Sequence, residues 1–224
     1  MMGKCLYYQT DLAGTFLFKC FHFGFFLLQM TLSMNTQRII LASSSPYRRE
    51  ILTKAGLDFT WHAPAIDESR YIGESASELV KRLARTKAET LSEKENSLII
   101  GSDQIAECAG HIFGKPKNRS EAIEQLSRAS DSTILLHCGL ALLNTQTQNC
   151  SVIHETCEVV YRKLSRQTIE SYIEREQPYD ICGSLRIEGP GIALLKQVKS
   201  NDPNTILGLP LIQLFDLLSE QVQK

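Results

Sequence analysis

Hydrophobic and polar positions from Arg38 onward alternate in the rhythm of strands followed by helices. The compact apolar run Arg38–Ala42 predicts a buried strand. Ser45 and Pro46 follow it, a typical helix cap and first helical residue, and Gly56 marks a stop, so a helix is expected up to Ala55. The first strand therefore leads through a serine-rich turn straight into a helix.

The middle of the chain repeats this alternation. Ser75 and Glu78 form a capping box that opens a long amphipathic helix through about Leu91. The apolar run Ser97–Ser102 predicts a buried strand that ends at Asp103. The other elements predicted here are a short strand at Phe59–His62, a hairpin around Ala109-Gly110 and a helix from about Ser120 to Ala129.

The second half opens with two long strand-like stretches that predict an antiparallel hairpin, Thr133–Leu143 and about Cys150–Tyr161. A helix capped by Ser165 and ending before Pro178, an apolar strand at Ile192–Val198 and a final helix after Pro210 complete the pattern. The alternation runs without an internal repeat or linker, and it predicts one α/β domain: a mixed central sheet flanked by helices.

The first 33 residues do not fit this rhythm. They hold six of the nine phenylalanines, yet the apolar run Phe16–Leu28 is interrupted by Lys19 and His22. It is shorter than the ~20 apolar residues of a membrane span, and no small-x-small cleavage site follows it. We expect residues 1–33 to be a non-native or disordered N-terminal extension and residues 34–224 to be the working domain, with Met34 as the natural start and Met30 as the alternative.

Composition excludes several classes of protein. The chain of 224 residues carries 24 Lys and Arg against 25 Asp and Glu. This near-zero balance argues against a duplex-binding protein, so no nucleic-acid partner is expected, nor any membrane partner. Seven scattered cysteines form no C-x-x-C pair and are interpreted as mostly small buried hydrophobes of a reducing compartment, the cytoplasm. Four histidines fall in strand-like stretches, where a structural role is the better interpretation: His62, His111, His137 and His154.

The serine-rich turn offers the first candidate chemistry. Ser43, Ser44 and Ser45 present hydroxyls and unpaired backbone N–H groups at a helix start, where the helix dipole favours an anion. Arg48 and Arg49 stand in the first helical turn, where acids are usual, and the planar guanidinium suits phosphate. The alternative is a solvated, capped helix with surface arginines.

Acidic and basic residues elsewhere suggest a metal-assisted reaction on phosphate. Asp67 and Glu68 form a carboxylate pair after a short strand, and Asp103 is predicted at the end of a central strand, where α/β sheets bind ligands. Carboxylates from two loops, with Lys87 and Lys115, provide what a magnesium-assisted phosphoryl hydrolysis requires. The alternatives are that Lys87 is an ordinary surface residue of its helix and that Gly114-Lys115-Pro116 is only a turn. The chain has no G-x-x-x-x-G-K-[ST] loop.

Six ordered segments resemble the Maf-like nucleoside triphosphate pyrophosphatases. They are Leu41–Leu52, Ile66–Glu68, Arg82–Ala88, Gly101–Gln104, Gly114–Pro116 and Gly208–Pro210. The resemblance spans Arg38 to about Leu218 and implies an inosine-triphosphatase-like fold with two lobes around a nucleotide cleft. The implied reaction is hydrolysis between the α and β phosphates with a divalent metal, Mg or Mn, releasing a nucleoside monophosphate and pyrophosphate.

The resemblance also implies roles for individual residues. Asp103 matches the catalytic proton acceptor of the family. The other matching active-site positions are Ser43, Arg48, Glu68, Lys87 and Lys115. We expect the serine, the arginine and the lysines to bind the triphosphate, and Glu68 with Asp103 to hold the metal and orient water. Because an ordinary aspartate has a pKa near 3.9, whether Asp103 is base, ligand or both stays open.

Three positions predict the substrate. The branch resembling dTTP/UTP pyrophosphatases has Arg, Thr and Gln where this chain has Tyr47, Gln104 and Glu188. This set, with Cys182–Ser184 and Asp202–Thr205, resembles the 7-methyl-GTP pyrophosphatase branch instead. N7-methylation makes guanine cationic, so the Tyr47 ring can attract it, and Glu188 can accept hydrogen bonds from N1–H and the 2-amino group. The alternative interpretation is that the three residues are only structural substitutions.

The predicted activity is therefore conversion of 7-methyl-GTP to 7-methyl-GMP and pyrophosphate, which would remove modified nucleotides. Two alternatives remain: a dTTP/UTP pyrophosphatase of the same family, and a non-catalytic nucleotide-binding regulator of septum formation. The predicted partner is a small nucleotide, and a homodimer is compatible with the sequence.

Overall fold

A single mixed sheet forms the centre of the computed structural model, which describes residues 37–222. The predicted extension over residues 1–33 lies outside the described residues. The strands are β1 (Arg38–Ala42), β2 (Thr60–His62), β3 (Ser97–Cys108), β4 (His111–Phe113), β5 (Thr133–Asn144), β6 (Asn149–Tyr161) and β7 (Leu195–Ser200). Their order is β2-β1-β3-β5-β6-β7, with β4 paired to β3.

Five helices and three short 3-10 turns surround the sheet in the described part of the chain. The helices are α2 (Pro46–Lys54), α3 (Ala76–Glu89), α4 (Arg119–Ala129), α5 (Arg166–Glu176) and α6 (Leu211–Val222), and the turns are η1 (Cys182–Ser184), η2 (Pro190–Leu194) and η3 (Thr205–Leu207). The sheet is parallel where β1 pairs with β2 and β3, and antiparallel elsewhere. The predicted mixed α/β class is therefore confirmed.

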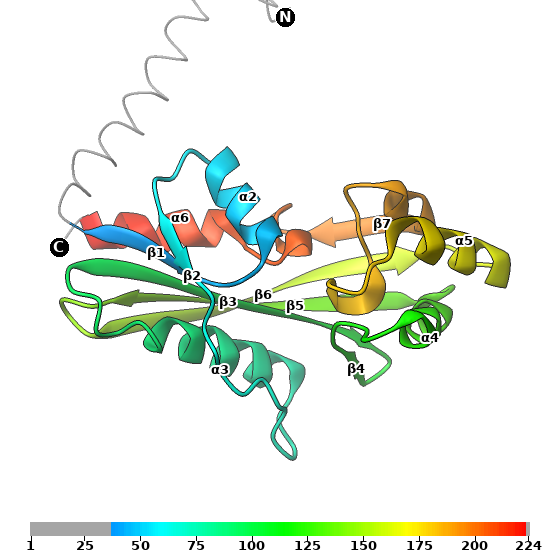
Figure 1. Ribbon diagram of the computed structural model, residues 1–224, viewed down its shortest axis with the longest axis horizontal. Coiled ribbons are helices and arrows are strands. Elements are labelled where there is room, and N and C mark those ends of the chain that lie inside the picture. The colour runs from blue at the N-terminus through cyan, green and yellow to red at the C-terminus, as the bar shows by residue number, and fades with distance from the viewer. Residues whose placement is uncertain (1–36, 223–224) are drawn as a thin grey trace, which may run out of the picture.

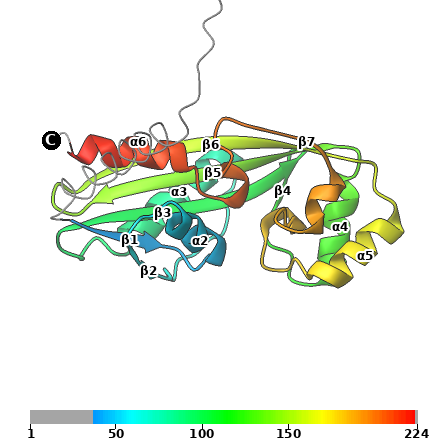
Figure 2. The same ribbon diagram turned by 90° about the horizontal axis from the view of Figure 1, so that it is seen from above.

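The molecule has two lobes joined by the long strands β3, β5 and β6 (Figure 1). In one lobe α3 covers one face of the sheet, while α2 and α6 cover the other face and share one apolar cluster. In the second lobe α4, α5 and the turns η1 and η2 gather at the far end of the strands, as Figure 2 shows from above. The two-lobed shape expected from the family resemblance is thus present.

Local sequence signals account for the helix starts. Ser45 caps α2 by accepting a hydrogen bond from the Arg48 N–H, and Pro46 occupies the first turn. Ser75 and Glu78 make the predicted capping box of α3. Ser165 caps α5. These three predictions are confirmed, because a cap depends only on residues within one helical turn.

Helix α3 lies unusually close to the sheet because two glycines face it. A Cβ on Gly101 of β3 would overlap the carbonyl oxygen of Ala84, and a Cβ on Gly139 of β5 would overlap that of Val80. Only glycine permits this approach of helix backbone to strand backbone. The close packing brings Lys87, in the last turn of α3, directly over β3.

Two strand predictions were wrong in their bounds. Strand β3 does not end at Asp103 but continues to Cys108, because β5 pairs with it from Leu98 to Glu107. It is the neighbouring strand β1 that ends, at Ala42 opposite Gly101, so the sheet opens beside Asp103. The apolar stretch predicted as a strand from Ile192 to Val198 divides instead into the turn η2 and strand β7.

The second discrepancy follows from the chemistry of η2. Pro190 has no backbone N–H to donate to a strand pairing, and a Cβ on Gly191 would overlap the Arg186 carbonyl oxygen. The chain therefore turns tightly before it can join β6.

The four histidines predicted in strand-like stretches do lie in strands, namely His62, His111, His137 and His154. The five described cysteines are unpaired; four are buried and Cys150 is half-buried.

Candidate active site

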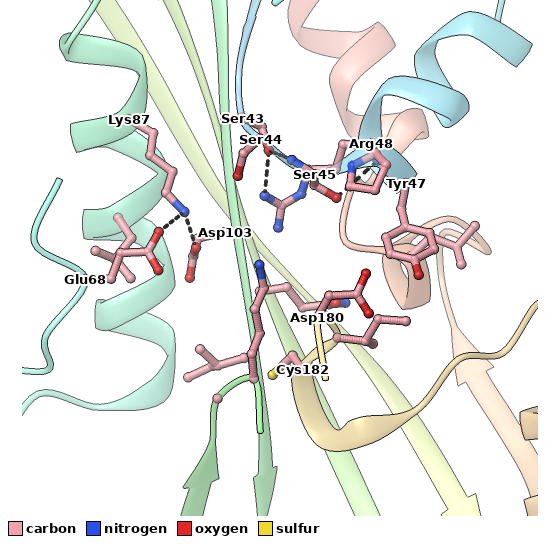
Figure 3. Close-up of a pocket in the computed structure, with 18 of the residues that line it drawn as sticks. Ser43, Ser44, Ser45, Tyr47, Arg48, Glu68, Lys87, Asp103, Asp180 and Cys182 are labelled. Atoms are coloured by element: carbon pink, nitrogen blue, oxygen red, sulfur yellow. Dashed lines mark hydrogen bonds and ion pairs between the residues drawn. The ribbon is translucent and has the colours of Figure 1, made fainter. Parts of the chain in front are cut away.

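A cavity of about 550 Å³ opens between the two lobes, beside the point where β1 ends. Its walls come from the β1–α2 turn, the loop before α3, α3 itself, the middle of β3, the turn after β4 and the segments around η1 and η3. The structure brings all nine sequence-predicted site residues to this cavity: Ser43, Tyr47, Arg48, Glu68, Lys87, Asp103, Gln104, Lys115 and Glu188. Figure 3 shows several of them converging from different elements.

The serine-rich turn holds Arg48 in a fixed position. The buried guanidinium donates from Nη1 to Ser102 O at 2.8 Å and to Ser43 Oγ at 3.2 Å, and from Nε to Gly208 O at 2.9 Å. Among residues 37–222, Nη2 has no hydrogen-bond acceptor. The arginine is thus preorganised, with one terminal nitrogen left to bind an anion in the cavity.

On the opposite wall one lysine bridges two carboxylates. Lys87 Nζ lies 2.6 Å from Asp103 Oδ1 and 2.6 Å from Glu68 Oε1 (Figure 3). Lys87 and Asp103 are buried, whereas the Glu68 side chain is 59% exposed on its loop. Burial would raise the pKa of Glu68, but the hydrogen bond and charge of Lys87, with Lys115 and Arg48, hold it below its ordinary value. Glu68 is therefore a carboxylate at neutral pH.

The two carboxylates suit a divalent cation. Each places one oxygen at the same distance from a single positive charge, so both face one cation position. Carboxylate oxygens are the ligands that Mg²⁺ prefers, and Mg²⁺ commonly takes only one or two of them, with water and substrate phosphates completing its shell. The described residues contain no cluster of three or more His, Cys, Asp or Glu side chains for a metal. Glu68 and Asp103 thus fit a magnesium ion that is shared with a phosphate ligand.

A third wall carries the residues predicted to select the substrate. Tyr47 is half-buried at the start of α2, and Glu188 is exposed on the segment between η1 and η2. Gln104 lies further along β3 than Asp103, and its Nε2 donates to Thr205 O at 2.7 Å. The amide nitrogen of Gln104 is therefore hydrogen-bonded to the η3 loop, and its amide oxygen is the group available to accept a hydrogen bond from a ligand.

Two features of this cavity were not predicted from the sequence: the position of Asp180 and the supporting role of Asp202. Asp180 lies on the wall beside Tyr47, and it is preceded by no strand or capping signal that would have marked it. Asp202 is fully buried behind the η3 loop and accepts backbone N–H groups from Asn204 at 2.7 Å and Ile212 at 2.5 Å. That loop supplies the Gly208 carbonyl that holds Arg48. The motif Asp202–Thr205 was visible in the sequence, but only the fold shows that it supports the site.

The chain is similar to known proteins over nearly all of its described length. The family model described as "Maf-like protein" matches residues 38–221. The chain belongs to the Maf-like family. The match covers every element of the described structure that lines the cavity.

Relatives of this Maf-like chain are nearly half identical to it over the aligned residues. A protein of Idiomarina loihiensis named 7-methyl-GTP pyrophosphatase is 47% identical over 82% of this chain and 94% of its own length. A protein of Nitrosococcus oceani with the same name is 46% identical over 81% of this chain and 92% of its own length. Among solved structures, a HAM1 protein from Coxiella burnetii is 18% identical with a TM-score of 0.47, covering 82% of this chain and 99% of that chain. Within residues 37–222, no helix has the length and apolar character needed to span a bilayer.

Proposed function

We propose that this Maf-like chain is a nucleoside triphosphate pyrophosphatase that hydrolyses 7-methyl-GTP to 7-methyl-GMP and pyrophosphate. The observation that carries the proposal is the pair of carboxylates, Glu68 and Asp103, held around one positive charge in a cavity that also contains Arg48 and Lys115. The names of the relatives in Idiomarina and Nitrosococcus support the same reaction and substrate. The cysteines within residues 37–222 are unpaired and mostly buried, which supports a reducing compartment, the cytoplasm.

The cationic side of the cavity binds the triphosphate. Arg48 Nη2 donates to one phosphate oxygen, while Lys115 neutralises another from the turn after β4. Ser43 Oγ, which already accepts from Arg48, adds a hydroxyl at the same point. The start of α2 beside them favours an anion through its dipole. These groups hold the leaving pyrophosphate in line with the attacking water.

Asp103 accepts the proton of the attacking water. Its carboxylate is buried and oriented by Lys87 at 2.6 Å, so it cannot turn away from the cavity. Glu68 and Asp103 would hold a divalent cation, which supplies charge neutralisation on phosphate oxygens and a lower pKa for the water it binds. When phosphate arrives, Lys87 is placed to donate to it, because its ammonium already faces the cavity.

The base lies on the Tyr47 side. The tyrosine ring offers a face for stacking, and attraction of the ring quadrupole is strongest for a cationic base such as N7-methylated guanine. Glu188 accepts hydrogen bonds from N1–H and the 2-amino group of guanine, a pair of donors that a pyrimidine lacks. Tyr47 and Glu188 therefore select the base while the opposite wall performs the reaction.

A nucleotide panel tests the proposal. The purified chain is incubated with Mg²⁺ or Mn²⁺ and 7-methyl-GTP, GTP, dTTP or UTP, and pyrophosphate release is measured. We expect the highest kcat/KM for 7-methyl-GTP. A preference for dTTP or UTP would refute the assignment of 7-methyl-GTP as the substrate. No turnover of any nucleotide would refute the enzymatic activity and favour a nucleotide-binding regulator.

The catalytic role of Asp103 is tested by Asp103→Asn. We expect turnover to fall by at least about 10³-fold, because the amide cannot accept the proton. Asp58→Asn is the matched control, since Asp58 is exposed after α2 and does not line the cavity. Retained activity in Asp103→Asn, with Asp58→Asn also active, would show that Asp103 is not the proton acceptor.

A further inference from the structure

The cavity carries opposite charge on its two sides. Arg48, Lys87 and Lys115 face the carboxylate pair, where the phosphates are proposed to bind. Across the cavity, Asp180 and Glu188 line the wall that also bears Tyr47. A ligand that spans the cavity therefore meets positive charge at one end and negative charge at the other.

The surroundings of Tyr47 are dominated by carboxylates. Partial burial raises the pKa of the Tyr47 phenol, and the negative charge of Asp180 raises it further. Arg186 acts in the opposite direction, while Glu188 and Glu176 raise the pKa again. The carboxylate of Asp180 is thus the charged group that acts most strongly on Tyr47, and Figure 3 shows the two side chains on the same side of the cavity.

Asp180 is held in place from behind. Arg186 Nη2 donates to its Oδ1 at 3.1 Å, and Arg186 does not line the cavity. The backbone N–H of Arg186 donates in turn to the Tyr172 hydroxyl at 2.8 Å, and that hydroxyl donates to Ser184 O at 3.0 Å. Among the described residues Oδ2 of Asp180 has no hydrogen-bond donor, so it is the oxygen available to a ligand.

We propose that Asp180 is a specificity-determining residue that, together with the Tyr47 ring, favours a purine base carrying a positive charge over the same base without it. This proposal rests on the proposed function and extends it to a residue that neither the motifs nor the resemblance assigned. The carboxylate attracts the cationic ring, whereas it gains nothing from neutral guanine. Tyr47 supplies the stacking face and Asp180 supplies the counter-charge.

The effect of Asp180 should appear in substrate binding. The base stays cationic throughout the reaction, so Asp180 interacts equally with the ground state and the transition state. Its removal is therefore expected to raise KM for 7-methyl-GTP and leave kcat nearly unchanged. A general loss of fold would instead lower the amount of active enzyme and reduce kcat for every substrate.

The test compares Asp180→Asn with the parent on 7-methyl-GTP and GTP. We expect the ratio of kcat/KM for the two substrates to fall about fivefold, the size typical of one partly exposed charge pair. In the parent the ratio should also decline from about 0.05 M to 0.5 M salt, because both substrates carry the same triphosphate and only the base charge differs. The ratio for Asp180→Asn should change less with salt.

Two controls accompany this test. Asp131→Asn makes the same chemical change at an exposed turn in the same lobe, outside the cavity, and should leave the ratio unchanged. Asp180→Glu keeps the charge and should retain most of the preference. If Asp180→Asn shows the parent's ratio and salt dependence, the role of Asp180 is refuted while the proposed function stands. If the parent itself fails to hydrolyse 7-methyl-GTP, the proposed function is refuted first.

Discussion

Replacing Lys87 by methionine removes the one positive charge that bridges Glu68 and Asp103. Methionine keeps a flexible apolar stem of similar length, so the packing of α3 against Gly101 and the sheet is largely preserved. The change leaves Asp103, a buried carboxylate, without the ammonium that now lies 2.6 Å away. The main effect is therefore electrostatic.

The expected loss of stability follows from the burial of each partner. Removing one member of a buried ion pair costs about 3–5 kcal/mol, because the remaining charge is left unpaired. The Glu68 side chain is 59% exposed, and its pair with Lys87 adds little since water screens it. We therefore expect the low end, about 3 kcal/mol, which corresponds to a fall in Tm of about 6–12 °C for a domain of this size.

The assay is thermal and urea unfolding of the metal-free protein at neutral pH. Lys54→Met is the matched control, because Lys54 pairs with Glu50 at 2.7 Å but both side chains are largely exposed on α2. It should cost less than about 1 kcal/mol. Added Mn²⁺ should raise the Tm of Lys87→Met more than that of the parent, since the two carboxylates would then lack the ammonium that lies between them.

Equal stability of Lys87→Met and Lys54→Met would contradict this expectation, because it would mean that Lys87 does not stabilise the buried Asp103 carboxylate. A large loss of stability in Lys87→Met that Mn²⁺ does not offset would show that Glu68 and Asp103 do not share one cation position. Both measurements are made without nucleotide, so they do not depend on the substrate.

Three further predictions concern other parts of the structure. Gly139→Ala should destabilise the fold by about 3 kcal/mol or more in urea unfolding, because the new Cβ overlaps the Val80 carbonyl; unchanged stability would mean that α3 can move away from the sheet. Burial lowers the pKa of both His137 and His154, whose ring nitrogens lie 3.0 Å apart, from the ordinary 6.5, so stability should be full above that pH and decline as pH falls below it. Urea unfolding at several pH values should show a shallower decline for His154→Gln, and an equal slope would contradict this. Asp202→Asn should cost about 2 kcal/mol and raise KM, because the carboxylate fixes the loop that holds Arg48, and a variant with the parent's KM and Tm would show that the loop needs no such support.

The sequence by itself determined the features that depend on near neighbours in the chain. The caps at Ser45 and Ser75, the stop at Gly56 and the long β5–β6 hairpin follow from hydrogen bonds and turns that involve residues a few positions apart. The same holds for the serine-rich turn between β1 and α2, whose residues are consecutive and line the cavity. The motifs also indicated which residues would share a cavity, although not how they meet.

Tertiary structure decided the rest, because the remaining contacts join residues far apart in the chain. Asp103 lies in the middle of β3, and it faces the cavity only because β1 ends beside it. Lys87 reaches it because two glycines let α3 approach the sheet, and its ammonium then bridges Glu68 and Asp103. Asp180 is brought to the cavity by the lobe that contains α4 and α5. Such contacts depend on the approach of whole elements, and no local spacing encodes that.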